Sequence, residues 1–280
     1  MYGSVLSSAN TMGQLQQKLN GISSNLSNSN TTGYKRSETT FSDMLYQQTN
    51  NLQDERNEAG RLTPDGLRIG TGAGVAQTAL RMEQGALQNT DRELDFAITD
   101  KDQFFQVESM TDGAPETQYT RDGSFYLSEN PEELDGWTLV NNQGDYLLGA
   151  DGERMDVPAG ASNFTLQEDG TLEAVNEAGE DIEIGQMELA RVTKPQLLEQ
   201  VDGNNYALPE LGELGLDEAD VLEFVPGAAE AVKQGSLEQS NVDVGQAMTD
   251  MMTTQRQYSF NARAISQGDQ MMGLINSLRG

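Results

Sequence analysis

The chain of 280 residues contains no histidine and no cysteine. The absence of both excludes disulfides, thiol nucleophiles, imidazole general bases and zinc sites built from these residues. Basic residues are also few, because 17 lysines and arginines stand against 45 aspartates and glutamates, for a formal net charge of −28. Phosphate recognition requires a basic surface, so this balance argues against a nucleic-acid partner.

Long hydrophobic runs are missing as well. A membrane-spanning helix needs about 20 consecutive apolar residues, and no segment approaches that length. We therefore expect no membrane insertion. Residues 1–8 lack the basic and continuous apolar regions of a cleavable signal peptide. If the protein leaves the cell, we expect it to use a route that needs no such peptide.

The acidic residues are concentrated in the middle of the chain. Residues 1–53 carry a net charge of +1 and residues 235–280 a net charge of −1, so residues 54–234 account for the whole −28. Because like-charged surfaces repel, the middle opposes self-association and the two ends hardly do. We expect the ends to lead any self-assembly, although an acidic surface by itself is also typical of salt- or alkali-adapted proteins.

Apolar residues near the N-terminus recur at heptad positions, which predicts an amphipathic helix with a coiled-coil-like row. No proline interrupts the repeat, and the run Asn28–Gly33 supplies residues that end helices. The two positions of the repeat hold Val5, Met12, Leu19 and Leu26, with Leu15 and Ile22 between them.

The C-terminus has the same repeat, and its helix is predicted to begin after Asn241 or Asp243, either of which can cap it. One heptad position holds Val244, Met251, Tyr258, Ile265 and Met272. The second position is less regular, being apolar at Ala247, Ala262 and Ile275 and polar at Thr254 and Asp269.

Between the ends the hydrophobic period changes from seven to two, which predicts short antiparallel strands with an acidic outer face. The predicted strands span residues 104–108, 124–127, 137–140, 145–148, 163–166 and 181–184. The predicted hairpin turns are Asp122–Gly123, Gln143–Gly144, Asp151–Gly152, Asp169–Gly170 and Ala178–Gly179.

These patterns predict an α+β fold in which the terminal helices form an antiparallel coiled-coil pair. An isolated amphipathic helix is not stable in water, and the other heptad segment is the simplest partner. The alternative is that both helices pack on the β domain as ordinary core. The predicted domains are a helical assembly domain (residues 1–34 with 238–280), an extended or β connector (35–95 with 193–237) and a β-rich outer domain (96–192).

Two patterns could indicate chemistry, and both are weak. Arg68–Gly74 contains glycines in a GxGxG spacing, but no strand precedes it and no P-loop lysine follows, so a flexible connector is the better interpretation. Acidic residues at Asp91, Glu93 and Asp95, or at Glu132 and Glu133, could serve a glycosidase. With 45 acids, such pairs arise by chance. We expect no catalytic, cofactor or metal site.

Two groups of motifs stand near the ends of the chain, one at residues 22–35 and one at residues 235–243, 255–258 and 269–272. They resemble the N-terminal and C-terminal signatures of bacterial flagellar rod and hook proteins. Residues 63–72, 85–91 and 119–125 continue the same layout, with the greatest likeness to distal rod proteins, including the paralogue of Gram-positive bacilli. The resemblance covers essentially the whole chain.

The resemblance implies a flagellar basal-body subunit that promotes motility mechanically. Such proteins leave the cell through the flagellar type III export apparatus without a cleaved signal peptide. They self-assemble, together with neighbouring rod and hook subunits, into a hollow shaft that transmits torque from motor to hook. Paired terminal helices line the tube, and the β domain lies outside. By this resemblance, Leu15, Leu19, Ile22 and Leu26 would meet Met251, Tyr258, Ile265 and Met272, and Asn30 and Gly33 would form an elbow.

We therefore predict a distal rod subunit, with a hook or proximal rod subunit as the alternative within the family. A secreted acidic β domain that binds or hydrolyses glycan is the alternative from another class. The residues predicted to carry assembly are Val5, Met12, Leu15, Leu19, Ile22, Leu26, Asn30, Gly33, Tyr34, Val244, Met251, Tyr258, Ile265, Met272 and Ile275.

Overall fold

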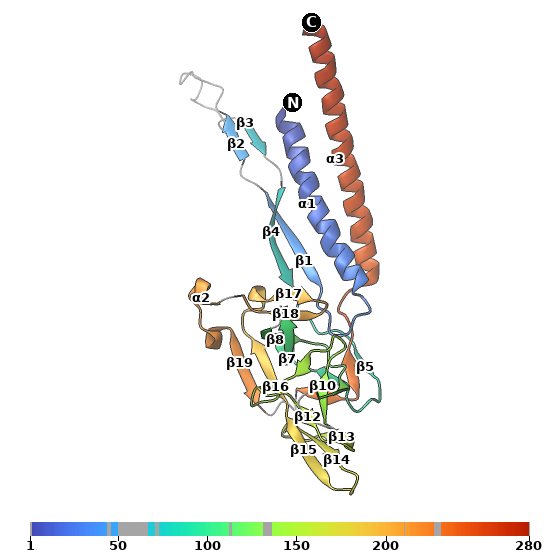
Figure 1. Cartoon of the computed structure of the whole chain (residues 1–280). Helices are drawn as coiled ribbons and strands as arrows, with labels where there is room; N and C mark the ends of the chain where they lie inside the picture. The colour runs from blue at the N-terminus through green and yellow to red at the C-terminus, as the bar shows by residue number, and fades with distance from the viewer. Residues whose placement is uncertain are drawn as a thin grey trace, which may run out of the picture. The chain divides into compact units, whose positions relative to one another are not determined.

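The computed structural model describes residues 2–43, 46–49, 67–70, 73–111, 114–130, 136–209, 211–226 and 231–279 (Figure 1). The protein is α+β, with a long helix at each end and a mainly antiparallel β middle, which confirms the predicted class. The chain forms two compact units. We call residues 1–26, 37–79 and 243–280 the helical unit, and residues 27–36 and 80–242 the β unit.

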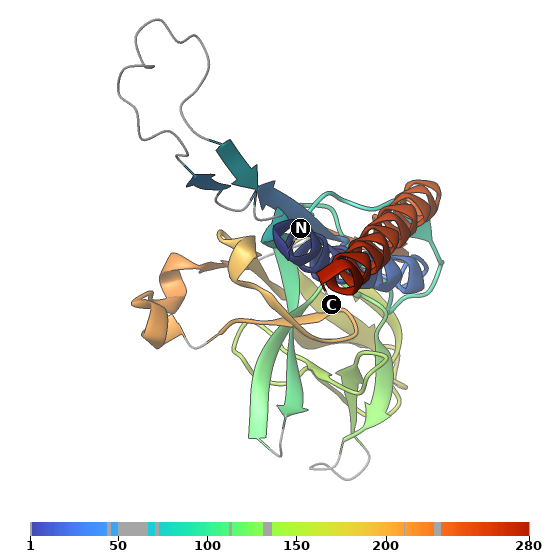
Figure 2. The same ribbon diagram turned by 90° about the horizontal axis from the view of Figure 1, so that it is seen from above.

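The helical unit contains α1 (Tyr2–Ser27) and α3 (Val244–Arg279), which run antiparallel and side by side in both ribbon views (Figures 1 and 2). The C-terminal turns of α3 extend beyond the first residue of α1 (Figure 1). The unit also contains the ladders β1–β4 and β2–β3. The strands are β1 (Ser37–Asp43), β2 (Tyr46–Thr49), β3 (Leu67–Gly70) and β4 (Ala73–Leu80).

Both helices end where the sequence predicts. After α1, the amide of Thr31 donates to the Asn28 carbonyl at 3.2 Å, and Gly33 adopts the left-handed conformation with φ of 68°. At the start of α3, the Asp243 carboxylate accepts a hydrogen bond from the Gln246 amide at 3.0 Å, so Asp243 is the N-cap.

The β unit is built on a ten-stranded antiparallel sheet. Its main order is β12-β10-β11-β7-β8-β18-β17, with β9 beside β10, β16 beside β7, and β19 beside β16. The strands are β7 (Gln103–Thr111), β8 (Ala114–Thr120), β9 (Tyr126–Glu129), β10 (Trp137–Val140), β11 (Tyr146–Leu147), β12 (Asp156–Val157), β16 (Glu188–Val192), β17 (Glu199–Asp202), β18 (Asn205–Ala207) and β19 (Leu222–Pro226).

Smaller elements complete the β unit. A three-stranded sheet has the order β13-β14-β15, and two short ladders pair β5 with β21 and β6 with β20. These strands are β13 (Ser162–Leu166), β14 (Thr171–Val175), β15 (Asp181–Gln186), β5 (Leu87–Asn89), β21 (Ser236–Glu238), β6 (Phe96–Ile98) and β20 (Val232–Gln234). The short helix α2 spans Leu211–Leu214, and 3-10 turns span Pro195–Leu197 and Glu218–Asp220.

Four of the predicted glycine turns are confirmed, since Gly144, Gly152, Gly170 and Gly179 all have positive φ. The predicted hairpin turn at Asp122–Gly123 is wrong. Gly123 does not have positive φ, and its backbone instead passes so close to β6 that a Cβ atom would lie 1.7 Å from the Phe96 carbonyl oxygen. Gly123 is thus required for close backbone approach rather than for a turn.

Strand β7 divides the core into two layers, because successive side chains of a strand point to opposite faces. Phe105 and Val107 belong to the larger cluster, in which Phe105 meets Phe125 edge to face at 5.4 Å between ring centroids. Phe104 belongs to the second cluster, where it meets Tyr206 at 5.9 Å. The β unit is therefore covered on both faces of its central strand.

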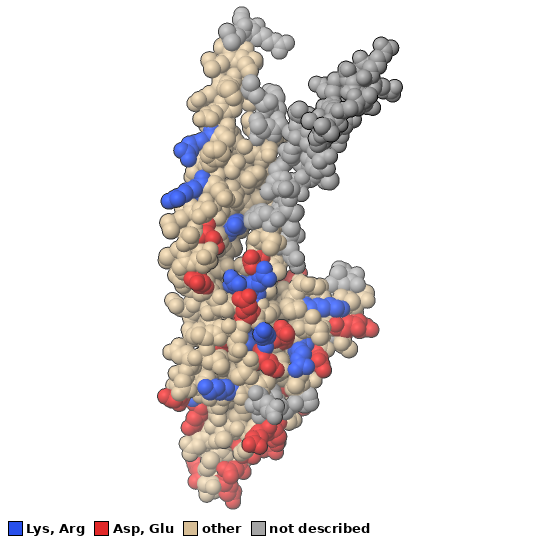
Figure 3. All heavy atoms as spheres, turned by 180° about the vertical axis from the view of Figure 1, so that it is seen from behind, with Lys and Arg blue, Asp and Glu red and all other residues tan. Residues whose placement is uncertain are grey.

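Acidic side chains gather over the end of the β unit formed by β13, β14 and β15 (Figure 3). Residues 162–186 contain seven acids and no lysine or arginine. This confirms the acidic outer face that the alternation of these strands predicts.

Candidate functional site

The first candidate site is the antiparallel pair of α1 and α3. The helices lie close together at Gly268, where a Cβ atom would lie 2.8 Å from Cγ2 of Val5. Both helices rise by about 1.5 Å per residue. A regular antiparallel pair in this register places Leu15 opposite Tyr258, Leu19 opposite Thr254, Ile22 opposite Met251 and Leu26 opposite Ala247.

Most of the predicted assembly residues lie on the less exposed side of these helices. Leu15 is buried, with 7% of its surface exposed. The half-buried ones are Val5, Met12, Leu19, Ile22 and Leu26 on α1, and Met251, Tyr258, Ile265 and Met272 on α3. The two remaining helical residues, Val244 and Ile275, are 38% and 48% exposed.

The second heptad position of α3 is shifted by one residue from the prediction at two places, near Ala262 and at Asp269. The buried positions are Thr254, which is 1% exposed, and Gly268, whereas Asp269 is exposed. Asn261, and not only the predicted Ala262, is half-buried. The heptad pattern selects apolar residues, whereas the close approach of the helices at Gly268 favours small residues.

The remaining predicted residues, Asn30, Gly33 and Tyr34, belong to the β unit. Asn30 is exposed, whereas Gly33 is buried and Tyr34 is 1% exposed. The Gly33 backbone packs closely against the chain that follows β8. A Cβ atom at this position would lie 2.4 Å from the Arg121 carbonyl carbon. Its amide donates to the Glu238 carbonyl at 2.8 Å.

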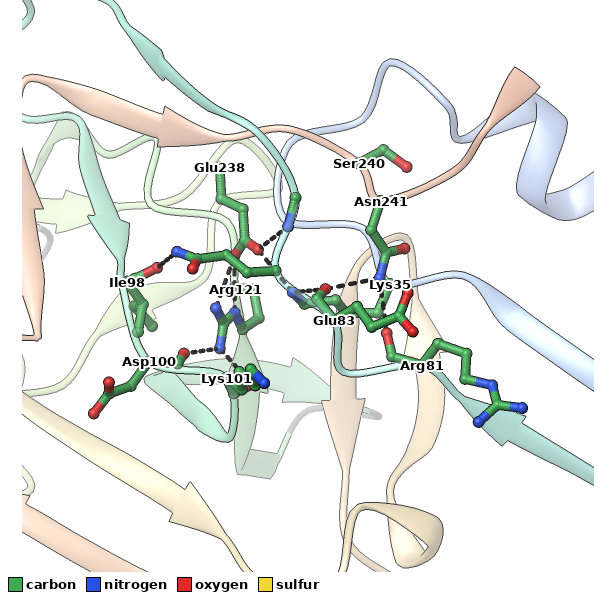
Figure 4. Close-up of polar contacts among 12 residues, drawn as sticks. Lys35, Arg81, Glu83, Ile98, Asp100, Lys101, Arg121, Glu238, Ser240 and Asn241 are labelled. Carbon is green, nitrogen blue, oxygen red and sulfur yellow. Dashed lines mark hydrogen bonds and ion pairs between the residues drawn. The ribbon is translucent and has the colours of Figure 1, made fainter. Parts of the chain in front are cut away.

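The second candidate site is a group of three buried charges in the β unit, which we call the charge cluster: Lys35, Arg121 and Glu238. Lys35 Nζ lies 2.7 Å from Glu238 Oε1, and Arg121 Nη2 lies 2.9 Å from Glu238 Oε2 (Figure 4). All three side chains are at most 1% exposed. The cluster joins one residue from each of the three chain regions that carry the signature motifs.

Two cations share one carboxylate in the charge cluster, and backbone carbonyls supply the remaining acceptors. Arg121 Nη1 donates to the carbonyls of Asp100, Lys101 and Gln103 at 2.7–2.8 Å. Lys35 Nζ donates to the Glu83 carbonyl at 2.9 Å. Burial lowers the pKa of the Lys35 amino group, and the neighbouring Arg121 guanidinium lowers it further against the opposing effect of Glu238.

These three residues lie within the motifs at residues 22–35, 119–125 and 235–243, but the motifs alone predict no role for them. No local signal places them together, since Lys35 and Glu238 are 203 residues apart. The sequence signal that could point to the charge cluster is a charged residue near a glycine whose backbone packs tightly against another segment. A Cβ atom at Gly85 would lie 1.8 Å from the Gln239 carbonyl oxygen, just as Gly33 and Gly123 admit only hydrogen at their contacts.

The described acidic residues that could serve a glycosidase form ion pairs or hydrogen bonds with other parts of the fold. Asp95 is buried and pairs with Arg92 at 2.8 Å, and Glu93 accepts the Phe164 amide at 2.8 Å. Asp91 accepts from the Asn89 amide group at 2.6 Å. Glu132 and Glu133 lie outside the described residues, as does part of the glycine-rich segment, whose other residues belong to β3 and β4.

The described residues offer neither a metal site nor a membrane-spanning helix. Among them, no three acidic side chains are grouped so as to hold a metal ion. No described helix combines the length and the apolar character needed to cross a membrane.

A β domain joined to two paired terminal helices is the arrangement that the resemblance to flagellar axial proteins implies. Three family models match this chain. "Flagella basal body rod protein" matches residues 6–35, "Flagellar hook protein FlgE/F/G D1 domain" matches residues 99–174, and "Flagellar basal body rod FlgEFG protein C-terminal" matches residues 233–278.

Individual proteins match over their full length. The flagellar hook-basal body complex protein FlhP of Bacillus subtilis is 40% identical, with 100% of both chains covered. The flagellar basal-body rod protein FlgG of Borreliella burgdorferi is 32% identical, with 100% of this chain and 99% of FlgG covered. FlgG of Bacillus subtilis is 30% identical over 100% of both chains. The chain therefore belongs to the flagellar basal-body rod and hook protein family.

Proposed function

We propose that this protein is a subunit of the distal rod of the bacterial flagellum, exported without a cleaved signal peptide by the flagellar export apparatus. Its role is structural rather than catalytic. Copies assemble into a helical homopolymer that meets neighbouring rod and hook subunits and transmits torque. The similarity to FlgG, whose name is that of a basal-body rod protein, supports rod over hook.

The observation that carries the proposal is the apolar surface that the helix pair leaves uncovered. Within the described residues, eight of the fourteen exposed large apolar side chains lie on α1 or α3, although the β unit is much larger. A concentration of exposed large apolar side chains on two helices favours a site of protein association. These residues are Leu6, Val244, Met248, Met252, Phe260, Met271, Leu274 and Ile275.

The distribution of charge also favours contact between copies through α1 and α3. The acidic end at β13–β15 repels its counterpart on another copy, whereas the helices carry little net charge. Copies that pack through α1 and α3 therefore bury apolar area and keep their acidic ends apart. The layout that the family resemblance implies, with helices lining the tube, accords with this distribution of charge.

Introducing a charge at the helix pair tests the proposal. We expect Leu19→Asp and Ile265→Asp to abolish incorporation into purified basal bodies and swimming in soft agar, because both side chains are half-buried. The matched controls are Gln16→Asp and Gln267→Asp, which add the same charge at exposed positions of α1 and α3. Normal assembly of Leu19→Asp and Ile265→Asp would overturn the proposed use of the helices.

Position along the shaft tests the finer assignment. An epitope inserted in the turn between β14 and β15 should be found on the rod of isolated hook-basal bodies by immunogold labelling. Label on the hook would contradict the distal rod assignment and favour the hook alternative. Label restricted to the rod segment nearest the membrane would favour the proximal rod.

A further inference from the structure

The chain passes between its two units four times. The crossings are at residues 26/27, 36/37, 79/80 and 242/243. Just inside the β unit, the chain forms three boundary segments: residues 31–36, 81–86 and 238–241. We call these three segments the clasp.

Direct hydrogen bonds join the segments of the clasp to one another. The Arg81 amide donates to the Arg36 carbonyl at 2.9 Å, and the Gln239 amide donates to the Ala86 carbonyl at 2.8 Å. Glu238 joins all three segments, because its carboxylate accepts from both Lys35 Nζ at 2.7 Å and the Gly85 amide at 2.8 Å. The clasp is therefore tied through main chain as well as through buried charge.

Asn241 is a second residue that joins all three segments. Its side-chain oxygen accepts the Arg36 amide at 2.7 Å. Its side-chain nitrogen donates to the carbonyls of Arg81 and Glu83, both at 2.8 Å (Figure 4). One amide group thus satisfies backbone groups of two other segments. Since Asn241 is two residues from the final crossing, it holds that crossing to the segments beside the crossings at 36/37 and 79/80.

We propose that the clasp is a mechanical coupling, in which Asn241 and the charge cluster make the four chain crossings share any load that passes between the helical unit and the β unit. This role rests on the proposed function, because a drive shaft carries such loads. When crossings are tied side by side, force reaches several hydrogen bonds and the buried ion pairs together. If the crossings were not joined by these bonds, each would bear the load separately, and the chain would extend first at the weakest crossing.

The burial of the charge cluster suits this role. Lys35, Arg121 and Glu238 are at most 1% exposed, so water cannot readily replace their interactions as they stretch. Breaking the cluster also exposes unpaired charges to a buried environment, which is costly. In the helical unit, Asn25 adds a reciprocal pair to the Ser37 backbone, accepting its amide at 2.9 Å and donating to its carbonyl at 2.8 Å.

Single-molecule pulling on the isolated full-length subunit tests the proposal. Because the chain has no cysteine, Asn10→Cys on α1 and Asn142→Cys in the β unit provide two unique attachment points at exposed positions. At constant force, we expect an opening of the clasp that precedes unfolding of the β unit. Asn241→Ala should shorten the lifetime of that first event at least about tenfold, the factor that three lost hydrogen bonds supply.

Asn176→Ala is the matched control. The Asn176 side chain also makes three hydrogen bonds, to the Ala178 amide and to the amide and carboxylate of Glu180, but all lie within one local turn. It should leave the lifetime of the first event unchanged. Equal lifetimes for Asn241→Ala and Asn176→Ala would overturn the proposal, as would β-unit unfolding as the first event in the chain that carries only the two attachment cysteines.

Two features keep the test decisive. If Asn241→Ala does not fold, Asn241→Asp is pulled instead, because it keeps the acceptor for Arg36 while losing the two donors, and the same outcomes decide. The measurement uses single subunits and needs no assembly. A failure of the proposed use of the helices, seen as normal assembly of Leu19→Asp and Ile265→Asp, is thus distinguishable from a failure of the clasp.

Discussion

The two units of this protein bury their apolar side chains very differently. In the β unit, Phe96, Phe105 and Phe125 are at most 1% exposed, and clusters fill both faces of β7. In the described parts of α1 and α3, Leu15 is the one large apolar side chain that is buried, while Phe260 and Leu274 are 68% and 65% exposed. The β unit is thus complete within one chain, whereas the helical unit has a surface that other copies can complete.

The largest expected effect comes from breaking the β unit at its charge cluster. Glu238→Gln leaves Lys35 and Arg121 buried without their shared carboxylate. We expect the free energy of unfolding to fall by about 3–5 kcal/mol, the range for removing one partner of a buried ion pair. Guanidinium denaturation followed by the fluorescence of Trp137 measures the change.

Glu223→Gln is the matched control, because Glu223 also pairs with an arginine, Arg191, at 3.2 Å, but is 61% exposed. Exposed pairs contribute little, so the free energy of unfolding should stay within about 0.5 kcal/mol of the unaltered protein. Equal losses from the two variants would mean that burial of the charge cluster does not stabilise the β unit.

A smaller change should loosen the helices and leave the β unit intact. Gly268→Val places a branched side chain where even a Cβ atom would lie 2.8 Å from Val5, and overpacking of this kind costs about 1–3 kcal/mol. We expect faster amide exchange across α1 in the free subunit and fewer assembled rods. Exchange within β7 should not change.

Gly273→Val provides the comparison within α3, since nothing lies within 4 Å of a Cβ atom at that position. Both variants alter helix propensity equally, so the difference between them reports packing alone. Identical exchange in the two variants would show that α1 and α3 do not meet at Gly268.

The smallest effect concerns pH. Because the pKa of Lys35 is lowered below 10.5, the folded protein binds fewer protons than the unfolded chain as the pH rises toward 10.5. The free energy of unfolding should therefore rise with pH in that window through Lys35. Measurements should stay below pH 10, the ordinary pKa of tyrosine, because burial raises the pKa of Tyr206 and gives the opposite slope above it.

Lys35→Met should remove this rise while costing less stability than Glu238→Gln, because Arg121 and Glu238 remain a balanced pair. Denaturation of both chains at several alkaline pH values gives the two slopes. An unchanged slope in Lys35→Met would assign the pH dependence to other groups.

The helices and most strands could be predicted because their signals are local. A seven-residue repeat identifies Leu15 and Leu19, and an acidic residue ahead of an apolar run identifies the cap Asp243. Alternation likewise predicts β10 and β15. These patterns depend on neighbours along the chain, and a sequence displays neighbours directly.

The clasp and the charge cluster could not be predicted, because their contacts join distant residues. Arg121 and Glu238 are 117 residues apart, and nothing near either one shows that they meet. Gly123 was misassigned for the same reason, since a glycine for a turn and a glycine for close approach look alike in sequence. Gly268 was missed because a search for apolar rows passes over small residues.

Chemical access to Phe260 tests the central claim most directly, namely that other copies complete the helical unit. In a cysteine-free chain, Phe260→Cys places a single thiol at a position that is 68% exposed. We predict rapid reaction with a maleimide in the free subunit and strong protection in assembled rods, while Ala178→Cys in the β14–β15 turn reacts in both. Equal reaction of Cys at position 260 in free subunits and rods would contradict the account.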